Sequence, residues 1–396
     1  MPRNLLSMVG PAELDHNELL WVMHEHWGPP WISERQQLEF PASDRSCIRV
    51  HWKEGRIVST NRGAVFSKQD FDAFAKRVDD ELVQSGGGRV ARVIHFTAPK
   101  PVTHTYLDPA ELLAIHPAPA DAPRPPTVFG DHPFVLEFKV VTSTSGFITN
   151  QRRARLGSEL CSVLNAVLRS AVISGLHRFS HHWVADTEQP VTVKWAQELY
   201  WIDGFADYAD GFSPARDAQV VLIPHDEYYA PAFRSTADDV VLPDSLSRLL
   251  LAYSELERVE RRRFLRACMW LQVAERSWDY SMSTWFTALV SSLETLVLPS
   301  GERCSKCGSV VGETRSFKEF VAHYSPSSEP AVRDSIYEMR STIAHGSAFL
   351  EADAAPWASS PITPDRVLQL ELMDDLVTVV RETIVNWLLE AHAASA

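Results

Sequence analysis

Residues 281–298 read SMSTWFTALVSSLETLVL, and this stretch decides the architecture of the C-terminal part of the chain. Its large apolar side chains recur three or four positions apart, which is the spacing of one face of an α-helix. Pro299 and Gly301 follow, and proline and glycine both terminate helices. The stretch therefore predicts an amphipathic helix that buries one face. Its apolar positions are Trp285, Phe286, Leu289, Val290, Leu293, Leu296 and Val297.

Three further helical segments flank this helix in the sequence. The preceding one spans 243–277 and opens on a proline followed by an acid, which are helix start signals. The following one spans 330–345 and stops near Gly346, since glycine commonly terminates helices. The last begins with Thr363 as a cap and Pro364 at the first helical position. Four long amphipathic segments joined by loops predict a helical bundle.

The first 236 residues alternate short strand-like runs with helical ones. Runs of β-branched and aromatic residues predict strands, and apolar residues at helical spacing predict helices between them. The expected strands are 46–60, 90–97, 128–141, 191–200 and 219–224, and the expected helices are 68–84 and 156–173. The predicted fold class is therefore a mixed α+β domain over residues 1–236, followed by an all-α helical bundle over residues 237–396.

The length and charge of the chain limit its classes of function. With 396 residues the chain is long for one hydrophobic core and suits two domains. Its formal net charge is −13, and an acidic surface does not attract polyanions, so nucleic-acid binding needs a local basic site. Arg258, Arg262 and Arg266 lie four positions apart and form the best basic stripe. This stripe could steer an RNA backbone, or it is a solvated helix face that neighbouring glutamates neutralise.

The sequence favours a cytoplasmic protein. Residues 1–14 have no sustained apolar segment and no small-residue cleavage site, so no signal peptide is expected. No run approaches the roughly 18 apolar residues that a membrane span needs, so no membrane partner is expected. The five cysteines are scattered, which is typical of a reduced compartment rather than of a disulfide framework.

Three segments occur in an order that resembles a known family. Residues 261–271 read RRRFLRACMWL, residues 285–296 read WFTALVSSLETL, and residues 337–346 read YEMRSTIAHG. In this order they are similar to Apea-like HEPN domains, over less than half of the chain. The resemblance implies that residues 237–396 form a HEPN-like helical bundle. Because members of this family commonly dimerise, it also implies a homodimer formed through the C-terminal bundle.

The resemblance implies a function as well. Many active members are metal-independent endoribonucleases that use an arginine and a histidine a few positions apart on a late helix, and Arg340 and His345 match this pattern. RNA is then the expected partner, and a role in prokaryotic defence or stress response is implied. Many other members have lost activity. The alternative is therefore a non-catalytic protein whose bundle serves dimerisation, sensing or ligand binding.

The residue types suit metal-independent cleavage of RNA, in which the 2′-hydroxyl of the substrate is the nucleophile. The imidazole of His345 can remove or return a proton, and the guanidinium of Arg340 can grip the phosphate and offset its developing charge. Ser341 lies four positions before His345 and shares its helix face, so it would hold the pair in place. Family members usually carry Asn, Asp or His at this position, so Ser341 is a departure.

Simpler roles are also open to these side chains. Arg340 could pair with acidic neighbours such as Glu338 or Asp334, and His345 could cap the last carbonyls of its helix. Glu294 lies on the border of the apolar stripe of its helix. It could pair with Arg340 and orient it, or it could face water as an ordinary boundary carboxylate.

Cys304 and Cys307 are the only closely spaced cysteines. Two thiolates on a tight turn, with Gly308 relieving the backbone, form half of a structural zinc site. His323 is a candidate third ligand, and two subunits sharing one ion through four sulfurs is another arrangement. A pair of free or redox-labile thiols is the alternative. The cofactor prediction is therefore a structural zinc ion, with no cofactor required for catalysis.

Overall fold

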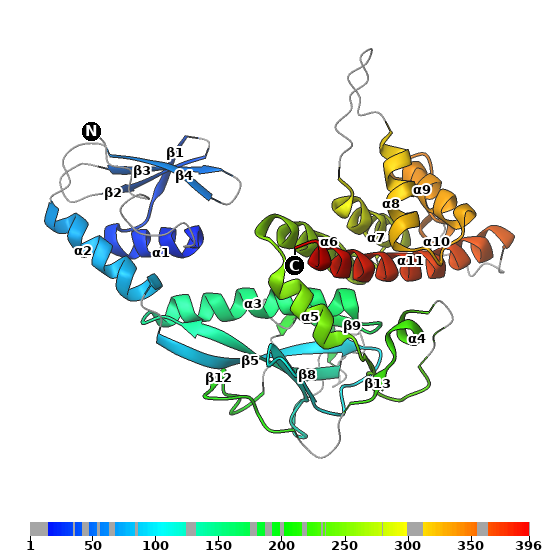
Figure 1. Ribbon diagram of the computed structural model, residues 1–396, viewed down its shortest axis with the longest axis horizontal. Coiled ribbons are helices and arrows are strands. Elements are labelled where there is room, and N and C mark those ends of the chain that lie inside the picture. Colours follow the sequence, from blue (N-terminus) through cyan, green and yellow to red (C-terminus); the bar gives the residue numbers. More distant parts are fainter. Residues whose placement is uncertain are drawn as a thin grey trace, which may run out of the picture. The chain divides into compact units, whose positions relative to one another are not determined.

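The chain divides into two compact units in a computed structural model (Figure 1). The first unit contains residues 1–90 and 139–155, and the second contains residues 91–138 and 156–396. The sequence predicted a domain boundary at 236/237, where short alternating strand-like and helical runs give way to long helical segments. Residue 237 itself lies inside the second unit. The structure describes residues 15–34, 36–41, 47–53, 56–62, 68–83, 86–123, 132–174, 180–186, 192–198, 202–215, 220–230, 233, 235–278, 280–298, 312–354 and 363–395.

The first unit is a small antiparallel sheet packed against two helices. The strands follow each other in the order β1-β2-β3-β4, so each pairs with its neighbour in sequence. Apolar side chains that alternate along the strands meet those of the helices in one core, which contains Leu19, Val22, Met23, Phe40, Ile48, Val50, Ile57, Phe74 and Val78. The elements are α1 (His16–Trp27), β1 (Trp31–Glu34), β2 (Gln37–Pro41), β3 (Cys47–Lys53), β4 (Arg56–Arg62) and α2 (Lys68–Val78), which ends in a π-helical turn (Asp79–Val83).

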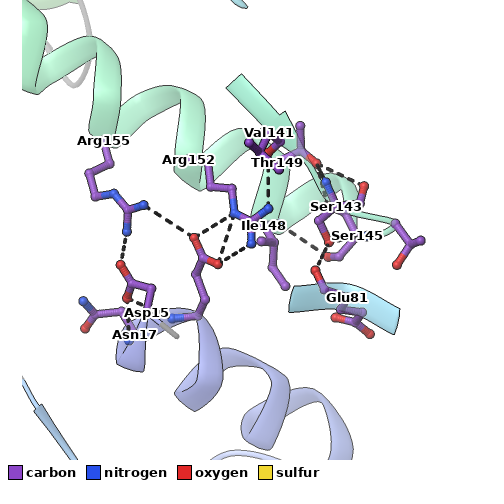
Figure 2. A network of polar contacts seen from close by, with 12 residues as sticks. Asp15, Asn17, Glu81, Val141, Ser143, Ser145, Ile148, Thr149, Arg152 and Arg155 are labelled. Atoms are coloured by element: carbon purple, nitrogen blue, oxygen red, sulfur yellow. Dashed lines mark hydrogen bonds and ion pairs between the residues drawn. The ribbon is translucent and has the colours of Figure 1, made fainter. Parts of the chain in front are cut away.

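A polar network joins α1 to the start of α3 (Gly146–Val167) within the first unit (Figure 2). Glu18 is buried, and its carboxylate accepts hydrogen bonds from Arg152 Nε at 2.9 Å and Arg152 Nη2 at 2.6 Å. Arg155 pairs with Asp15, which caps α1 by accepting from the backbone of Asn17 at 2.8 Å. A buried carboxylate is tolerated only when it is paired, so Arg152 is what allows Glu18 to lie there.

The second unit contains a six-stranded sheet in the order β12-β5-β8-β7-β6, with β9 pairing β5. Its central strands are buried along most of their length, because α3 packs against them. Asn165 on α3 accepts the backbone N–H of Val172 at 2.8 Å, and His95 on β5 contacts the carbonyl of Gly157 at 3.2 Å. The strands are β5 (Gly86–Ala98), β6 (Tyr106–Leu107), β7 (Leu113–Pro117), β8 (His132–Thr142), β9 (Ala171–Ser174) and β12 (Tyr208–Ala209).

The helical part of the second unit follows residue 245. In the described ranges its helices are α5 (Leu246–Glu255), α6 (Arg258–Ser277), α7 (Met282–Leu296), α8 (Glu313–Tyr324), α9 (Pro330–Ala344), the short α10 (Glu351–Ala354) and α11 (Pro364–Ser395). Figure 1 shows α11 running along α7. The stacked rings of Phe264 and Trp387, 5.9 Å apart, belong to this core. The mixed α/β N-terminal region and the helical C-terminal region are therefore confirmed, whereas the HEPN type of bundle stays a prediction.

Several element predictions are confirmed. Helix α7 begins after Ser281, whose side chain accepts from the backbone of Thr284, and α9 and α11 begin at the prolines that the sequence indicated. Thr363 caps α11 by accepting from the backbone N–H of Arg366 at 3.2 Å. Because α7, α9 and α11 position the candidate site, the sequence located its scaffold correctly.

The single helix predicted over 243–277 is wrong. Pro243 lies in a short strand, β14 (Leu242–Pro243), which pairs in parallel with β13 (Leu222–Ile223). The helical part then breaks at Leu256 and Glu257, whose extended ψ angles of 136° and 151° separate α5 from α6. The break lets Tyr253 on α5 and Arg261 on α6 both reach Glu159 on α3, at 3.0 and 3.2 Å.

The predicted helix over 156–173 also has different bounds. Helix α3 begins ten residues earlier, at Gly146, and ends at Val167, after which β9 forms. The remaining elements are α4 (His225–Tyr229) and the hairpin of β10 (Ser180–Asp186) and β11 (Thr192–Glu198). None of the helices in the described part of the chain combines the length and the apolarity that crossing a bilayer requires.

Candidate functional site

The C-terminal end of α9 presents His345 at the surface. His345 is the C-cap residue of α9. Gly346 follows with φ +69°, a left-handed conformation that glycine adopts without strain. The backbone N–H of Gly346 bonds to the carbonyl of Ile343 at 2.9 Å, and that of Ser347 bonds to the carbonyl of Thr342 at 3.0 Å. This pair of bonds is a Schellman motif. The backbone thus satisfies the last carbonyls, and the exposed imidazole is not needed as a cap.

Arg340 pairs with Glu294. Arg340 Nη2 lies 2.9 Å from Glu294 Oε2, and the two side chains are 28% and 31% exposed. The pairing that the sequence left open is therefore present, and Glu294 on α7 orients a guanidinium on α9. Asp334, one of the two acidic neighbours on the same helix, pairs instead with Lys318 at 2.7 Å.

The guanidinium of Arg340 keeps donors beyond the one used by Glu294. Its Nε is buried and, among the residues with described positions, makes no hydrogen bond. The side chain is partly exposed, so an incoming phosphate can approach it from solvent. Glu294 offsets some of the positive charge, so any hold on phosphate relies on the direction of the donors as much as on net charge.

Arg340 and His345 form no hydrogen bond with each other within one chain, as far as the structure describes it. Residues five positions apart on an α-helix point roughly 140° away from each other. In the described part of the chain, Arg340 pairs with Glu294 on α7, while His345 is exposed and its imidazole forms no hydrogen bond or ion pair. Ser341 is half-buried and shares the helix face of His345. One chain therefore offers an oriented guanidinium and an exposed imidazole from adjacent turns, on different sides.

The candidate zinc ligands Cys304 and Cys307 lie outside the described residues. His323, the candidate third ligand, pairs with Glu390 at 2.7 Å on α11. The hydrogen bond from His323 lowers the pKa of Glu390. Within the described ranges no group of three or more metal-ligating side chains gathers.

Helix α6 carries the basic stripe that the sequence indicated. Arg258, Arg262 and Arg266 are exposed, whereas Arg261 and Arg263 are partly buried and pair with Glu159 and Glu260. Trp270 continues the stripe one turn later and is 42% exposed. Among the described residues, Arg262 and Arg266 form no ion pair. The glutamates of this helix therefore neutralise only part of the stripe.

A polar network that the sequence did not reveal lies around Glu137 on β8. Its side chain has no exposed surface and accepts from Ser213 Oγ at 2.6 Å, His116 Nε2 at 3.2 Å and Arg92 Nε at 3.1 Å. Burial raises the pKa of Glu137, but the hydrogen bonds from His116 and Ser213 outweigh it and lower the pKa to about 2. The hydroxyl of Thr105 approaches His116 Nδ1 at 3.4 Å, which gives the order of a nucleophile, a base and an acid. Because Thr105 is only 2% exposed, no substrate reaches it, and the network is structural.

A cleft of about 860 Å³ is a further feature that the sequence did not predict. It lies between the start of α11, the end of α6 and the strand ends near Pro99, and a hollow of about 380 Å³ continues it. The two share Pro99, Arg169, Asp374, Val377 and Arg381 in their walls. The walls come from segments far apart in the chain, so no local pattern could have indicated them.

Comparison with known proteins does not place the chain in a family. No protein-family model, no curated protein and no solved structure matches it.

Proposed function

We propose that the C-terminal helices form a metal-independent endoribonuclease site when two copies of the chain pair. The observation that carries the proposal is the ion pair of Glu294 and Arg340, which orients a guanidinium one turn from an exposed imidazole on the same helix. His345 would act as acid and base, Arg340 would bind the scissile phosphate, and Ser341 would support His345. Because the two groups point to different sides of α9, the site takes Arg340 from one protomer and His345 from its partner.

The basic stripe on α6 supports an RNA substrate. Exposed arginines attract phosphates, and an exposed tryptophan offers a face on which an unpaired base can stack. Arg262, Arg266 and Trp270 follow each other at four-residue intervals, so they lie along one helix face. In a chain of net charge −13, this local arrangement gives single-stranded RNA a specific place to bind.

The first experiment incubates the purified full chain with single-stranded RNA in the presence of EDTA. We expect wild-type protein to cleave the RNA, and His345→Ala to lose at least about a hundredfold in rate, because general acid–base catalysis contributes that much. His392→Ala is the matched control, since it removes a surface histidine of α11 that pairs with Glu255. Cleavage that disappears with EDTA, or that survives His345→Ala, contradicts the proposal.

A mixing experiment separates a shared site from one within a chain. His345→Ala and Arg340→Ala protein are each expected to be inactive alone. When equal amounts are mixed and allowed to exchange subunits, half of the dimers are mixed, and one of the two sites in each is intact. We therefore expect recovery of about a quarter of the wild-type rate. No recovery from variants that exchange subunits would exclude the shared site.

The second candidate is a non-catalytic protein whose helical part binds a ligand. The cleft beside α11 favours it, because its volume lies in the range typical of ligand sites. Wild-type protein that cleaves no RNA at any concentration would favour this candidate over the nuclease.

A further inference from the structure

The wide end of the cleft has an aromatic and aliphatic wall. Trp278 and Trp285, from the end of α6 and the start of α7, meet edge to face with ring centroids 5.0 Å apart. Trp285 is buried, whereas Trp278 is 43% exposed and offers ring surface to the cleft. Leu370 and Val377 on α11 add aliphatic surface to the lining. A ligand with an apolar body would therefore lose contact with water where it packs against this lining.

The positive charges in the walls already have partners. Arg381 lies 3.6 Å from Glu275 and donates to the carbonyl of Asn165 at 3.4 Å. Arg169 donates to the carbonyls of Tyr228 and Ala230, each at 3.0 Å. Both guanidiniums thus hold the walls together.

Lys100, in the adjoining hollow, donates to the carbonyls of Ser235 and Ala237. The donors of the lysine and the two arginines are therefore engaged by the protein itself. The lining of the cleft carries two positive side chains, Arg169 and Arg381, against three carboxylates, Glu275, Glu371 and Asp374.

Two negative charges in the walls have no such partner. Glu371 and Asp374 are exposed, lie three positions apart on one face of α11, and form no ion pair with any residue that the structure describes. The pKa of Asp375 beside them is raised. Burial is the first cause of that rise, and the carboxylates of Asp374, Glu329 and Glu371 add to it.

We propose that the cleft binds a small organic ammonium ion whose apolar body lies against Trp278 and whose charged group lies between Glu371 and Asp374. Carboxylates attract an ammonium ion, and the indole ring of Trp278 gives the apolar body a surface to pack against. A carboxylate or phosphate ligand would meet the two uncompensated acids and be repelled. The proposal uses residues of α6, α7 and α11 outside the nuclease site, so it stands or fails independently of the proposed nuclease.

Three probes of one shape test the recognition of charge. Phenylbutylamine, phenylbutanol and phenylbutyrate are titrated into the full chain by calorimetry, with tryptophan fluorescence as a second readout. We expect the amine to bind about tenfold more tightly than the alcohol, and the carboxylate to bind most weakly. Equal binding of amine and alcohol overturns the proposal, and so does the absence of amine binding up to about 1 mM, where any interaction is too weak to be a site.

Variants then locate the site. Asp374→Asn and Glu371→Gln should each remove most of the preference for amine over alcohol, while binding of the alcohol is unchanged. Asp121→Asn is the matched control, because Asp121 is an exposed acid of the same unit outside the cleft. Trp278→Ala should weaken binding of amine and alcohol alike. An amine preference that persists in both acid variants overturns the placement, and thermal melting confirms that each variant is folded.

Discussion

At the scale of single residues, Glu137 shows how hydrogen bonds keep a buried carboxyl group charged. Removing a carboxylate from water is costly, yet donors from Ser213, His116 and Arg92 replace the lost water. These donors come from β5, β7 and a loop after β12, so the same residue ties together segments that are distant in sequence. The network therefore fixes the sheet on which α3 packs.

Glu137 should make stability depend on acidity. Its pKa in the folded state is about 2, below the unfolded value of 4.5, so the stabilisation is complete above about pH 4.5 and is lost as the pH falls towards 2. We expect Glu137→Gln to lower the free energy of unfolding at pH 7 by roughly 3 kcal/mol and to remove most of the acid dependence. Urea unfolding between pH 3 and pH 7 measures both quantities. Exposed Glu227 supplies the control substitution Glu227→Gln, and an equal effect there would refute the assignment.

At the scale of elements, the end of α9 depends on one glycine. Gly346 has φ +69°, and a Cβ atom built on it meets nothing within 4 Å, so a side chain there would cost conformational strain rather than a clash. We expect Gly346→Ala to lower the free energy of unfolding by about 1 kcal/mol. Gly211→Ala is the control, because Gly211 also has open space but no left-handed φ. Equal stability of the two variants would contradict this account of the helix end.

Sequence patterns predicted the helices whose ends carry their own signals. Ser281, Pro330, Gly346 and Pro364 mark the bounds of α7, α9 and α11, because caps and helix breakers act over one turn. The break at Leu256 escaped prediction, because tertiary contacts of α5 and α6 with α3 accompany it and no local signal marks it.

Some features of the candidate site could likewise be predicted from the sequence, and others could not. The pairing of Glu294 with Arg340 could be anticipated, because both lie on amphipathic helices whose buried faces were evident. The divergence of Arg340 from His345 follows from their spacing along the helix. The cleft at Trp278 could not be anticipated, since its walls meet only after β9, α6 and α11 have packed.

At the scale of the whole molecule, each unit has a core of its own. A substitution that destabilises one unit should therefore leave the other folded. Glu18→Gln leaves Arg152 buried without its charge partner, and a broken buried pair costs about 3 to 5 kcal/mol. We expect amides of α1 and β2 to lose hydrogen-exchange protection while those of α7 and α11 keep theirs. Arg155→Gln breaks the more exposed pair of Arg155 with Asp15, so it should reduce hydrogen-exchange protection less than Glu18→Gln does. Equal loss of protection in both units would show that they unfold together.

The connections of α5, α6 and α11 to α3 have a practical consequence for dissecting the chain. The carboxylate of Glu159 accepts hydrogen bonds from Tyr253 and Arg261, and the backbone carbonyl of Asn165 accepts one from Arg381. A recombinant fragment that starts at residue 237 would lack α3 and with it both acceptors. The surfaces of α5, α6 and α11 that contact α3 would then be exposed to solvent. Such a fragment does not represent the helices as they are in the intact chain. Biochemical assays of α9 should therefore use protein that retains β5 and α3.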